Sequence, residues 1–446
     1  MDFRNPSRRE LLAGLGAAAF SPLTARISFA QSLPTNPDVA IVGAGPAGLS
    51  AARTLAAAGK TFVLLEADDR IGGRANTDTT TFPGIAFDRG CAWIHSADRN
   101  PMLPVAKQHG FTLQLHDDGL DHIWYGREKF SDAQTKSVRR LTHEIVDANS
   151  KAAKKRDGAV SSVRPIRSKE EQATATAMGP MDMAVDFEDL SIRDYDDQAE
   201  LEPNYLVKEG FGAVVAKFGE GVPVSLETPV KQIRYGGQGV QVETDKGTVN
   251  AKAAIVTCST GALQSGYIKW DPLLPEWKES AIHQVPMALL AKIPLLLDGE
   301  RFGLKPFEDI LLEQPGKQDI YFISFPFEFP MMIGFVGGDF AWNLTAQGRD
   351  AAVDFASSSL NRVFGSNASK HIVKADFTQW PRNPWVRGAY SAALPGHFAS
   401  RAMIKRPLNE KVYFAGEAVA GPFAQTCGGA VLTGAEAANA IVKKLG

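Results

Sequence analysis

Two short stretches near the N-terminus, residues 38–42 and 61–65, are continuously hydrophobic after one initial polar residue. Continuous rather than alternating hydrophobicity is typical of parallel strands that are buried on both faces. The residues between the runs, 46–58, are rich in alanine and are followed by Gly59, which predicts a helix that ends there. The pattern therefore predicts a strand–helix–strand unit.

The rest of the chain divides into regions of different pattern. Residues 101–204 are polar and predict helices, whereas 222–258 predict strands separated by turn sequences. Further along, short mixed elements are predicted over 270–384, a strand over 412–416 and a helix over 428–445.

A glycine-rich turn joins the first strand to the first helix. Gly43 permits the tight turn, Gly45 lets the backbone approach a diphosphate, and Gly48 lets helix and strand pack closely. The anion then rests on free N–H groups at the helix N-terminus, beside Ala47. Glu66 ends the second strand, about 20 residues on, where a carboxylate binds an adenosine ribose and disfavours a 2′-phosphate. This spacing predicts dinucleotide binding.

A second glycine pair distinguishes FAD from NAD. Gly72 and Gly73 lie between Arg70 and Arg74, shortly after Glu66 and Ala67. Glycines beside an arginine would let a second stretch of backbone come close to the same diphosphate, which favours FAD over NAD.

With these motifs the chain resembles the flavin-containing amine oxidases, which include monoamine oxidases, polyamine oxidases and lysine-specific histone demethylases. The resemblance runs from about Asp38 to Leu445 and also rests on residues 88–95, 228–230 and 414–417. It implies an α/β fold in which a Rossmann-like FAD-binding domain is interleaved with an α+β substrate-binding domain. Motifs and resemblance together give the expected cofactor-binding residues: Gly43, Gly45, Ala47, Gly48, Glu66, Ala67, Gly73, Arg74, Gly90, Val230, Gly416, Glu417 and Ala430.

The resemblance also implies a substrate site. Tyr390 matches one wall of the amine cage, and Trp93, in the stretch that resembles the one over the flavin, is expected to bind substrate. Thr426 stands where monoamine oxidases have a second tyrosine, so the aromatic pair is incomplete. His95 either touches substrate or is a structural histidine. Ala389 stands where some relatives carry the cysteine that bonds to flavin, so the FAD is expected to be non-covalent.

Lys292 is the expected catalytic residue. It lies within the apolar run 287–295, where a lysine needs a polar partner or a route to water. In the family, the matching lysine holds a water against flavin N5. The alternative is a strand residue that reaches the surface.

These residues predict an amine oxidase. Hydride passes from the α-carbon of a neutral amine to flavin N5, the imine hydrolyses to an aldehyde or ketone, and O2 reoxidises the flavin to give H2O2. The alternatives are an amine dehydrogenase that uses a periplasmic electron carrier, a related flavin desaturase of a non-amine substrate, and an exported binding or assembly factor.

Net charge, cysteine spacing and acidic positions limit the classes of binding partner. The formal net charge of −2 argues against a nucleic-acid partner, which favours a basic face. The three cysteines are far apart in sequence and suggest buried small residues rather than a metal site. The acidic positions between 186 and 197 form either a solvated helix face or an attraction for a polycation.

The N-terminus resembles a twin-arginine export signal. Arg8 and Arg9 precede a weakly apolar stretch, Leu11 to Phe20, that is too short to span a bilayer. We therefore expect a periplasmic protein, without a stable membrane anchor, that is exported folded by the twin-arginine translocation machinery. The expected organisation is a signal peptide at 1–30, an FAD-binding domain at 37–100, 205–270 and 385–446, and a substrate-binding domain at 101–204 and 271–384.

Overall fold

The computed structural model describes Leu33 and residues 36–117, 119–198 and 202–446. Residues 33–446 form one compact unit. The expected signal peptide lies outside the described residues. Within the described residues, no helix has both the length and the hydrophobicity needed to cross a bilayer.

A four-stranded parallel sheet brings the two ends of the described chain together. Its order is β2-β1-β13-β22, and its strands are Phe62–Leu65, Val39–Val42, Ala253–Val256 and Val412–Phe414. The first three contain almost only buried apolar residues, which is why their sequences show no alternation. This sheet is the predicted strand–helix–strand unit extended by two strands from later in the chain.

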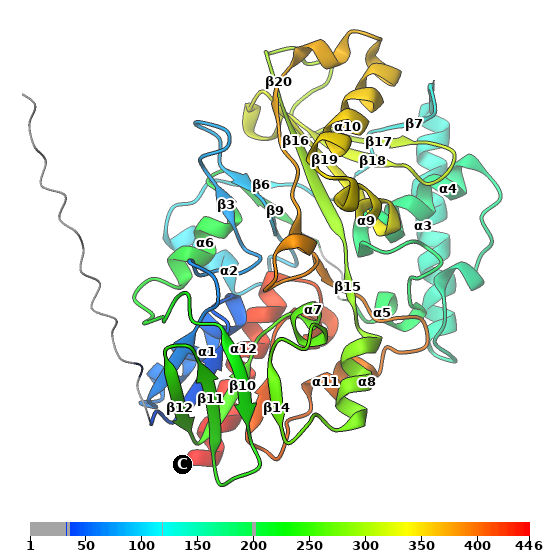
Figure 1. The fold of residues 1–446 in the computed structure, drawn as a ribbon. Coiled ribbons are helices and arrows are strands. Elements are labelled where there is room, and N and C mark those ends of the chain that lie inside the picture. The colour runs from blue at the N-terminus through cyan, green and yellow to red at the C-terminus, as the bar shows by residue number, and fades with distance from the viewer. Residues whose placement is uncertain (1–32, 34–35, 118, 199–201) are drawn as a thin grey trace, which may run out of the picture. The chain divides into compact units, whose positions relative to one another are not determined.

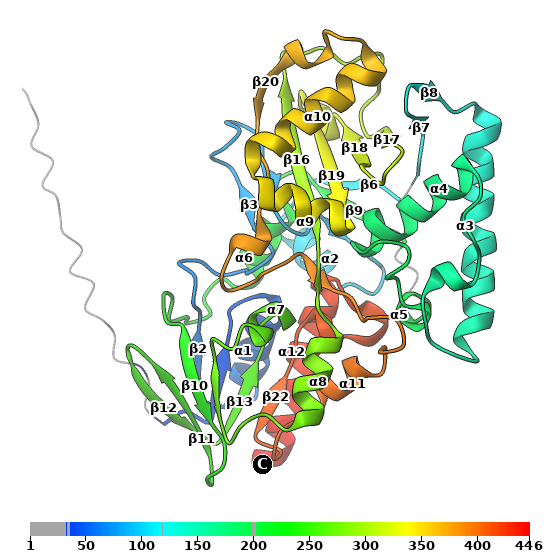
Figure 2. The ribbon, with the colours of Figure 1, turned by 45° about the vertical axis from the view of Figure 1, so that its right-hand side comes forward.

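Helices α1 (Pro46–Ala57) and α12 (Cys427–Leu445) lie side by side next to this sheet (Figures 1 and 2). Their backbones approach closely: a Cβ at Gly434 would lie 2.0 Å from the carbonyl oxygen of Ala47. The Ser50 hydroxyl donates to the carbonyl of Val431 at 2.7 Å. Small residues on both helices therefore allow the first and last helices to form one packed layer.

A second sheet of seven strands lies in the other half of the unit (Figure 2). Its order is β20-β16-β19-β18-β17-β7-β8, and its strands are Ile372–Ala375, Leu290–Leu297, Met331–Gly337, Ile320–Ser324, Asp309–Glu313, His122–Tyr125 and Glu128–Lys129. Helices α9 (Gly338–Gln347) and α10 (Arg349–Phe364) cover one side, with Leu344 and Leu360 in the core.

The region 101–204 is less helical than its pattern predicts. It contains α2 (Met102–Gln108), α3 (Asp132–Ala153), α4 (Lys169–Thr176), a π-helix (Ala177–Met183) and α5 (Ile192–Asp197). It also contains β7 and β8, and β6 (Leu113–Leu115) pairs with β9 (Tyr205–Val207), which pairs with β5 (Trp93–Ile94). These strands follow from pairing with distant partners, since β7 runs parallel to β17.

The remaining elements support the cavity described below. They are α6 (Phe211–Phe218), β10 (Val230–Arg234), β11 (Val240–Thr244), β12 (Gly247–Ala251), β14 (Lys269–Asp271), α7 (Thr260–Gln264), α8 (Glu276–Gln284), β15 (Met287–Ala288), β21 (Tyr390–Ser391), α11 (Ser400–Lys405), β3 (Thr77–Asp78) and β4 (Phe87–Asp88). The predicted division into two interleaved domains stays a prediction.

Candidate active site

One cavity of about 690 Å³ brings together residues from both halves of the unit. Every site residue expected from the sequence lines it, with the exception of Gly48. It is lined by the β1–α1 turn and the α12 N-terminus, and also by β16, β17, β18 and the π-helix. The roles expected of these residues stay predictions, but the fold places them around a single space.

The β1–α1 turn has the geometry that a diphosphate needs. Gly43 adopts φ +99°, a left-handed conformation that favours glycine, and a Cβ there would lie 2.6 Å from Thr257 Oγ1. Around Gly45 a Cβ would meet nothing within 4 Å, so its backbone faces open space. Gly48 instead packs inward, where a Cβ would lie 1.9 Å from the carbonyl oxygen of Gly43. Its place is thus in helix–strand packing rather than in the cavity wall.

Glu66 closes this turn at the end of β2. Its carboxylate accepts from the backbone N–H of Ala44 at 2.6 Å and from that of Asp68 at 2.9 Å. Burial raises the pKa of Glu66, an effect that these two donors partly offset. The side chain is held in one orientation, with lone pairs that remain suited to a ribose diol.

Arg74 and Glu417 form an ion pair across the cavity wall. Arg74 donates to Glu417 Oε1 at 2.8 Å and to the carbonyl of Ala389 at 2.9 Å. Glu417 also accepts from the hydroxyl of Ser391 at 2.8 Å and from its backbone N–H. Arg74 is therefore oriented by a carboxylate that is itself held by β21.

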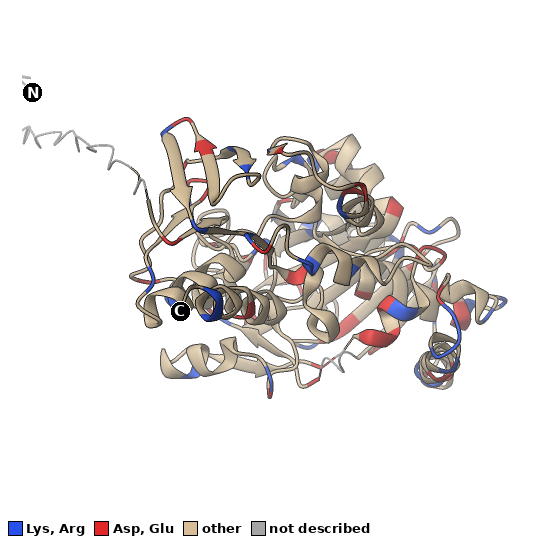
Figure 3. Ribbon diagram, turned by 90° about the horizontal axis from the view of Figure 1, so that it is seen from below, with Lys and Arg blue, Asp and Glu red and all other residues tan. Residues whose placement is uncertain are grey.

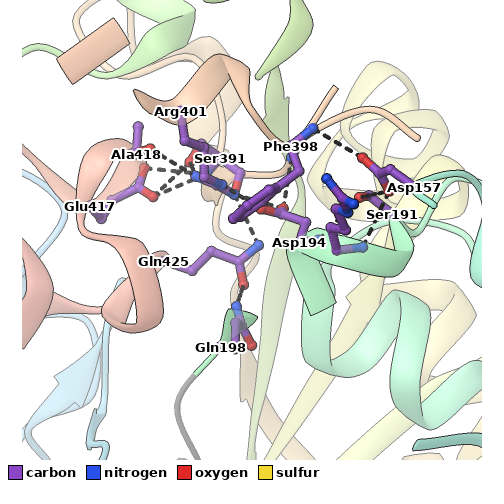
Figure 4. Close-up of polar contacts among 12 residues, drawn as sticks. Asp157, Ser191, Asp194, Gln198, Ser391, Phe398, Arg401, Glu417, Ala418 and Gln425 are labelled. Carbon is purple, nitrogen blue, oxygen red and sulfur yellow. Dashed lines mark hydrogen bonds and ion pairs between the residues drawn. The ribbon is translucent and has the colours of Figure 1, made fainter. Parts of the chain in front are cut away.

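A buried ion pair supports Ser391 in turn (Figure 4). Arg401 in α11 donates to the carboxylate of Asp194 in α5 at 2.5 and 2.8 Å. It also donates to the hydroxyl and carbonyl of Ser391 and to the carbonyl of Ala418. The side chains of Arg401 and Asp194 are only 5% and 3% exposed. Through Arg401, four of these hydrogen bonds link α5 to Ser391 in the strand that holds Glu417, and the fifth reaches Ala418.

The acidic positions between 186 and 197 do not form one uniform solvated face. Asp194 is buried in the ion pair with Arg401, and Lys317 contacts both Asp186 and Glu188. Seen from below, acidic and basic residues are interspersed over the ribbon (Figure 3). The sequence gives no sign of the Arg401 partner, which lies 207 positions from Asp194.

Lys292 lies inside the molecule, not at its surface. It is 6% exposed on β16, and its Nζ donates to the carbonyls of Asp88 at 2.8 Å and Gly90 at 2.6 Å. Burial lowers the pKa of Lys292 to about 8, against the opposing influence of the Asp88 charge. The Lys292 amino group therefore has two carbonyl partners, and its pKa lets it change charge near physiological pH.

Aromatic side chains form much of the remaining wall. The Tyr390 hydroxyl donates to the carbonyl of Asp182 in the π-helix at 2.8 Å, and burial raises its pKa well above the usual range. Trp93 stacks on His95 with ring centroids 6.0 Å apart. Thr426 caps α12 by accepting from the N–H of Gly429 at 2.9 Å. These four residues therefore have fixed hydrogen bonds or ring contacts at the cavity.

The sequence interpretation missed several cavity residues. Cys91, Cys258 and Cys427 are half-buried residues that pack against the hydrophobic cores, and they also line the cavity, which the sequence did not indicate. Met181 and Asp182 in the π-helix and Leu311, Tyr321 and Phe335 in the seven-stranded sheet also line it. No group of three or more potential metal ligands is found in the part of the chain that the structure describes.

The site fits FAD. The open backbone at Gly45 and the N-terminus of α1, which has no side-chain cap, supply N–H donors for a diphosphate. Gly73 approaches this turn, because a Cβ there would lie 3.5 Å from the Cα of Gly45. Glu66 supplies the carboxylate for a ribose. The cavity then continues to Lys292 and the aromatic wall, as a flavin beside a substrate requires.

Comparison with known proteins identifies the family. The sequence profile described as "Flavin containing amine oxidoreductase" matches residues 46–442. Lysine-specific histone demethylase 2 of Homo sapiens is 26% identical over 443 residues, which cover 91% of this chain and 53% of the demethylase. Polyamine oxidase 2 of Arabidopsis thaliana is 28% identical over 435 residues, which cover 91% and 88%. The chain thus spans about half of the first relative and most of the second.

A solved structure of wild-type putrescine oxidase bound to putrescine has the same fold. Its TM-score is 0.74 at 21% identity, over 92% of this chain and 100% of that chain. The likeness confirms the predicted α/β fold. Because the family profile covers most of the chain, the protein belongs to the flavin-containing amine oxidoreductases, whose cofactor is FAD.

Proposed function

We propose that the protein oxidises a primary or secondary amine and uses O2 as electron acceptor. When bound, FAD would supply the redox chemistry, namely a two-electron acceptor for the hydride on the carbon next to the amine nitrogen and a route for these electrons to O2, which would be reduced to H2O2. The oxidised amine is an imine, which water hydrolyses to an aldehyde or ketone.

One observation carries this proposal. The glycine turn that suits a dinucleotide and the compartment lined by Trp93, Tyr390 and Lys292 are parts of the same cavity. A cofactor held at the turn therefore has a substrate compartment beside it. This compartment is lined by aromatic rings and by the buried Lys292, whose lowered pKa lets it change charge near neutral pH. An assembly factor has no need for such a compartment.

The residues of this chain prepare the amine. An alkylamine with a pKa near ~10.4 is almost wholly charged at pH 7, but an apolar cavity favours its neutral form. A neutral Lys292 has a lone pair that accepts a proton, directly or through a water, while its two N–H groups stay on Asp88 and Gly90. The aromatic wall excludes bulk water and orients the reacting carbon.

The names of the relatives suggest the amines to test. They range from a polyamine oxidase and a putrescine oxidase to histone demethylases that act on lysine. A panel of 1,4-diaminobutane, spermidine, 2-phenylethylamine and a methylated lysine peptide spans these classes.

We expect at least one amine of this panel to bleach the oxidised flavin anaerobically and to release H2O2 in air. The low-pH limb of the reduction rate at saturating amine reports the bound amine, and it moves when an amine of different basicity is used. Bleaching without peroxide supports a dehydrogenase with a protein acceptor. No bleaching with any amine supports the desaturase or binding alternatives and contradicts the proposal.

The FAD is proposed to be non-covalent and to depend on Glu66. Ala389 at the candidate linkage position carries no nucleophile. Glu66→Ala removes the ribose acceptor and leaves the N–H of Ala44 without its partner, so we expect about tenfold or more weaker FAD binding. Acid precipitation of the wild type should leave FAD in the supernatant, and fluorescence titration of the apoprotein measures the affinity. Equal affinity in the variant contradicts the Glu66 role.

We also propose export to the periplasm by the twin-arginine route. It is supported by Arg8-Arg9 before a short apolar stretch and by a cofactor that is inserted before export. Arg8→Lys with Arg9→Lys keeps the charge, yet the precursor is expected to stay in the cytoplasm. Fractionation and immunoblotting measure this, and normal periplasmic yield of the double variant rules the route out.

A further inference from the structure

Two cavity-wall rings, those of Trp93 and His95, are held from behind by buried polar side chains. The Trp93 Nε1–H donates to His116 Nδ1 at 3.3 Å. His95 Nδ1 lies 2.8 Å from Asn204 Oδ1. His116 and Asn204 are only 6% and 1% exposed, and neither lines the cavity. They form a layer between the wall and the core.

The contact with Trp93 fixes the tautomer of His116. An indole N–H is only a donor, so His116 Nδ1 must accept and the imidazole proton must be on Nε2. That nitrogen lies 3.3 Å from Oδ1 of Asp309, whose side chain is 3% exposed. A carboxylate at this place favours the required tautomer, as in other His–carboxylate pairs. Asp309 therefore acts on Trp93 through His116.

Asp309 also holds a second part of the wall. Its carboxylate hydrogen-bonds to Tyr321, which lines the cavity. Phe335 lies between the two supported residues, with its ring centroid 5.7 Å from that of Trp93 and 5.7 Å from that of Tyr321. Trp93, Phe335 and Tyr321 thus form a continuous aromatic wall, supported at both ends by one carboxylate.

The backbones of this supporting layer are fixed as well. The His116 N–H donates to the carbonyl of Asn204 at 2.9 Å, and the Asn204 N–H donates to Asp117 Oδ1 at 2.7 Å. The Asp309 N–H donates to Asp121 Oδ2 at 2.9 Å. Since three separate chain segments converge here, the layer is rigid enough to set the position of rings that it contacts.

We propose that His116 and Asp309 are positioning residues that set amine selectivity, by fixing the Trp93–Phe335–Tyr321 wall of the substrate compartment. This inference rests on the proposed amine oxidation. A buried polar pair that served only stability would be replaceable without a change in selectivity. A pair that positions the wall cannot be replaced without a change in selectivity, because a displacement of about 1 Å at a reacting centre costs up to about 10²-fold in rate.

The test compares four variants. His116→Phe removes the acceptor for Trp93, Trp93→Phe removes the donor with the smallest change of the wall, and the third variant combines both. His122→Phe is the control, because His122 pairs similarly with Glu308 at 3.4 Å but does not line the cavity or contact Trp93. For each, kcat and KM are measured separately with 1,4-diaminobutane and 2-phenylethylamine, alongside melting temperature and flavin content.

We expect the ratio of kcat/KM for the two amines to change at least about tenfold in His116→Phe and in Trp93→Phe. The double variant should change it no further, because both singles remove the same hydrogen bond. His122→Phe should keep the wild-type ratio.

The outcomes separate the two proposals. If His116→Phe does not fold, Asp309→Asn decides, because it keeps the shape of the side chain but removes the carboxylate beside His116 Nε2. A ratio that stays at the wild-type value in the folded variants, or effects that multiply in the double variant, overturns the positioning role while leaving amine oxidation in place. A wild-type enzyme that bleaches with no amine overturns the proposed function and with it this inference.

Discussion

Lys292→Met is expected to slow turnover by about 10²-fold or more while FAD stays bound, because the variant loses the side chain proposed to exchange a proton beside the flavin. Methionine is of similar length and suits the apolar run of β16. The carbonyls of Asp88 and Gly90 each lose a donor, which costs about 1–3 kcal/mol apiece, but a buried cation is no longer desolvated. The fold should therefore survive.

The pH profile supplies a second signature of Lys292. With a pKa of about 8, Lys292 is protonated below that pH and neutral above it. Only the neutral form has a lone pair for a proton, so the rate should rise as pH increases through about 8. This inflection should be the same for every amine and absent from Lys292→Met, whereas the limb that reports substrate moves with substrate basicity.

Lys278→Met is the matched control. Lys278 is also fully buried, and its Nζ donates to carbonyls of Met403, Ile404 and Arg406 at the end of α11, away from the cavity lining. Burial lowers its pKa to about 7. Its replacement should lower the melting temperature and leave the rate per bound flavin unchanged. The rates of flavin reduction and of flavin reoxidation are measured separately in both variants. If Lys292→Met keeps the wild-type value of both rates, Lys292 has only a structural role.

Arg401→Met is expected to destabilise the protein by about 3–5 kcal/mol and to weaken FAD binding, because it leaves Asp194 buried without its counter-charge. Ser391 loses two donors in the same variant, so the strand that holds Glu417 loses its support. A double variant, Arg401→Met with Asp194→Leu, should recover part of the stability, since neither charge then remains buried.

The comparison for this ion pair lies on the same helix. Lys405 in α11 pairs with Glu436 at 2.8 Å, but their side chains are 41% and 60% exposed. Lys405→Met should change stability by no more than about 1 kcal/mol. Melting temperatures are compared with and without added FAD. An Arg401→Met protein as stable as Lys405→Met, with wild-type FAD affinity, would show that the pair supports neither the fold nor Glu417.

The cofactor half of the site was predictable because its signals are local. The runs 39–42 and 62–65 are apolar and bounded by glycine or an acidic residue, the glycine turn lies within residues 43–48, and Glu66 follows about 20 residues on. Gly43, Gly45 and Glu66 could therefore be placed from neighbours in the sequence alone. Lys292 was found by a different local signal, a charged residue within an apolar strand.

The substrate half was less predictable because it is built from distant pairings. Nothing near Tyr321 or Phe335 in sequence indicates that strands β18 and β19 place them at the cavity. The aromatic residues of β7 occur in a polar region and pair in parallel with β17, almost 190 positions later. Asp194 reads as one more surface acid until its distant partner, Arg401, is known.

The parallel sheet joins β1 and β2 to β22, and α1 packs on α12, so the FAD pocket is complete only after the segment from β22 to α12 has been synthesised. While a ribosome still holds that segment, Gly416, Glu417 and the N-terminus of α12 are not in place beside the glycine turn. Loading of FAD must therefore follow synthesis and packing of α12. A chain cut short before α12 would retain the glycine turn and Glu66 yet form no complete cofactor site, so premature termination would yield colourless protein rather than a weakened enzyme.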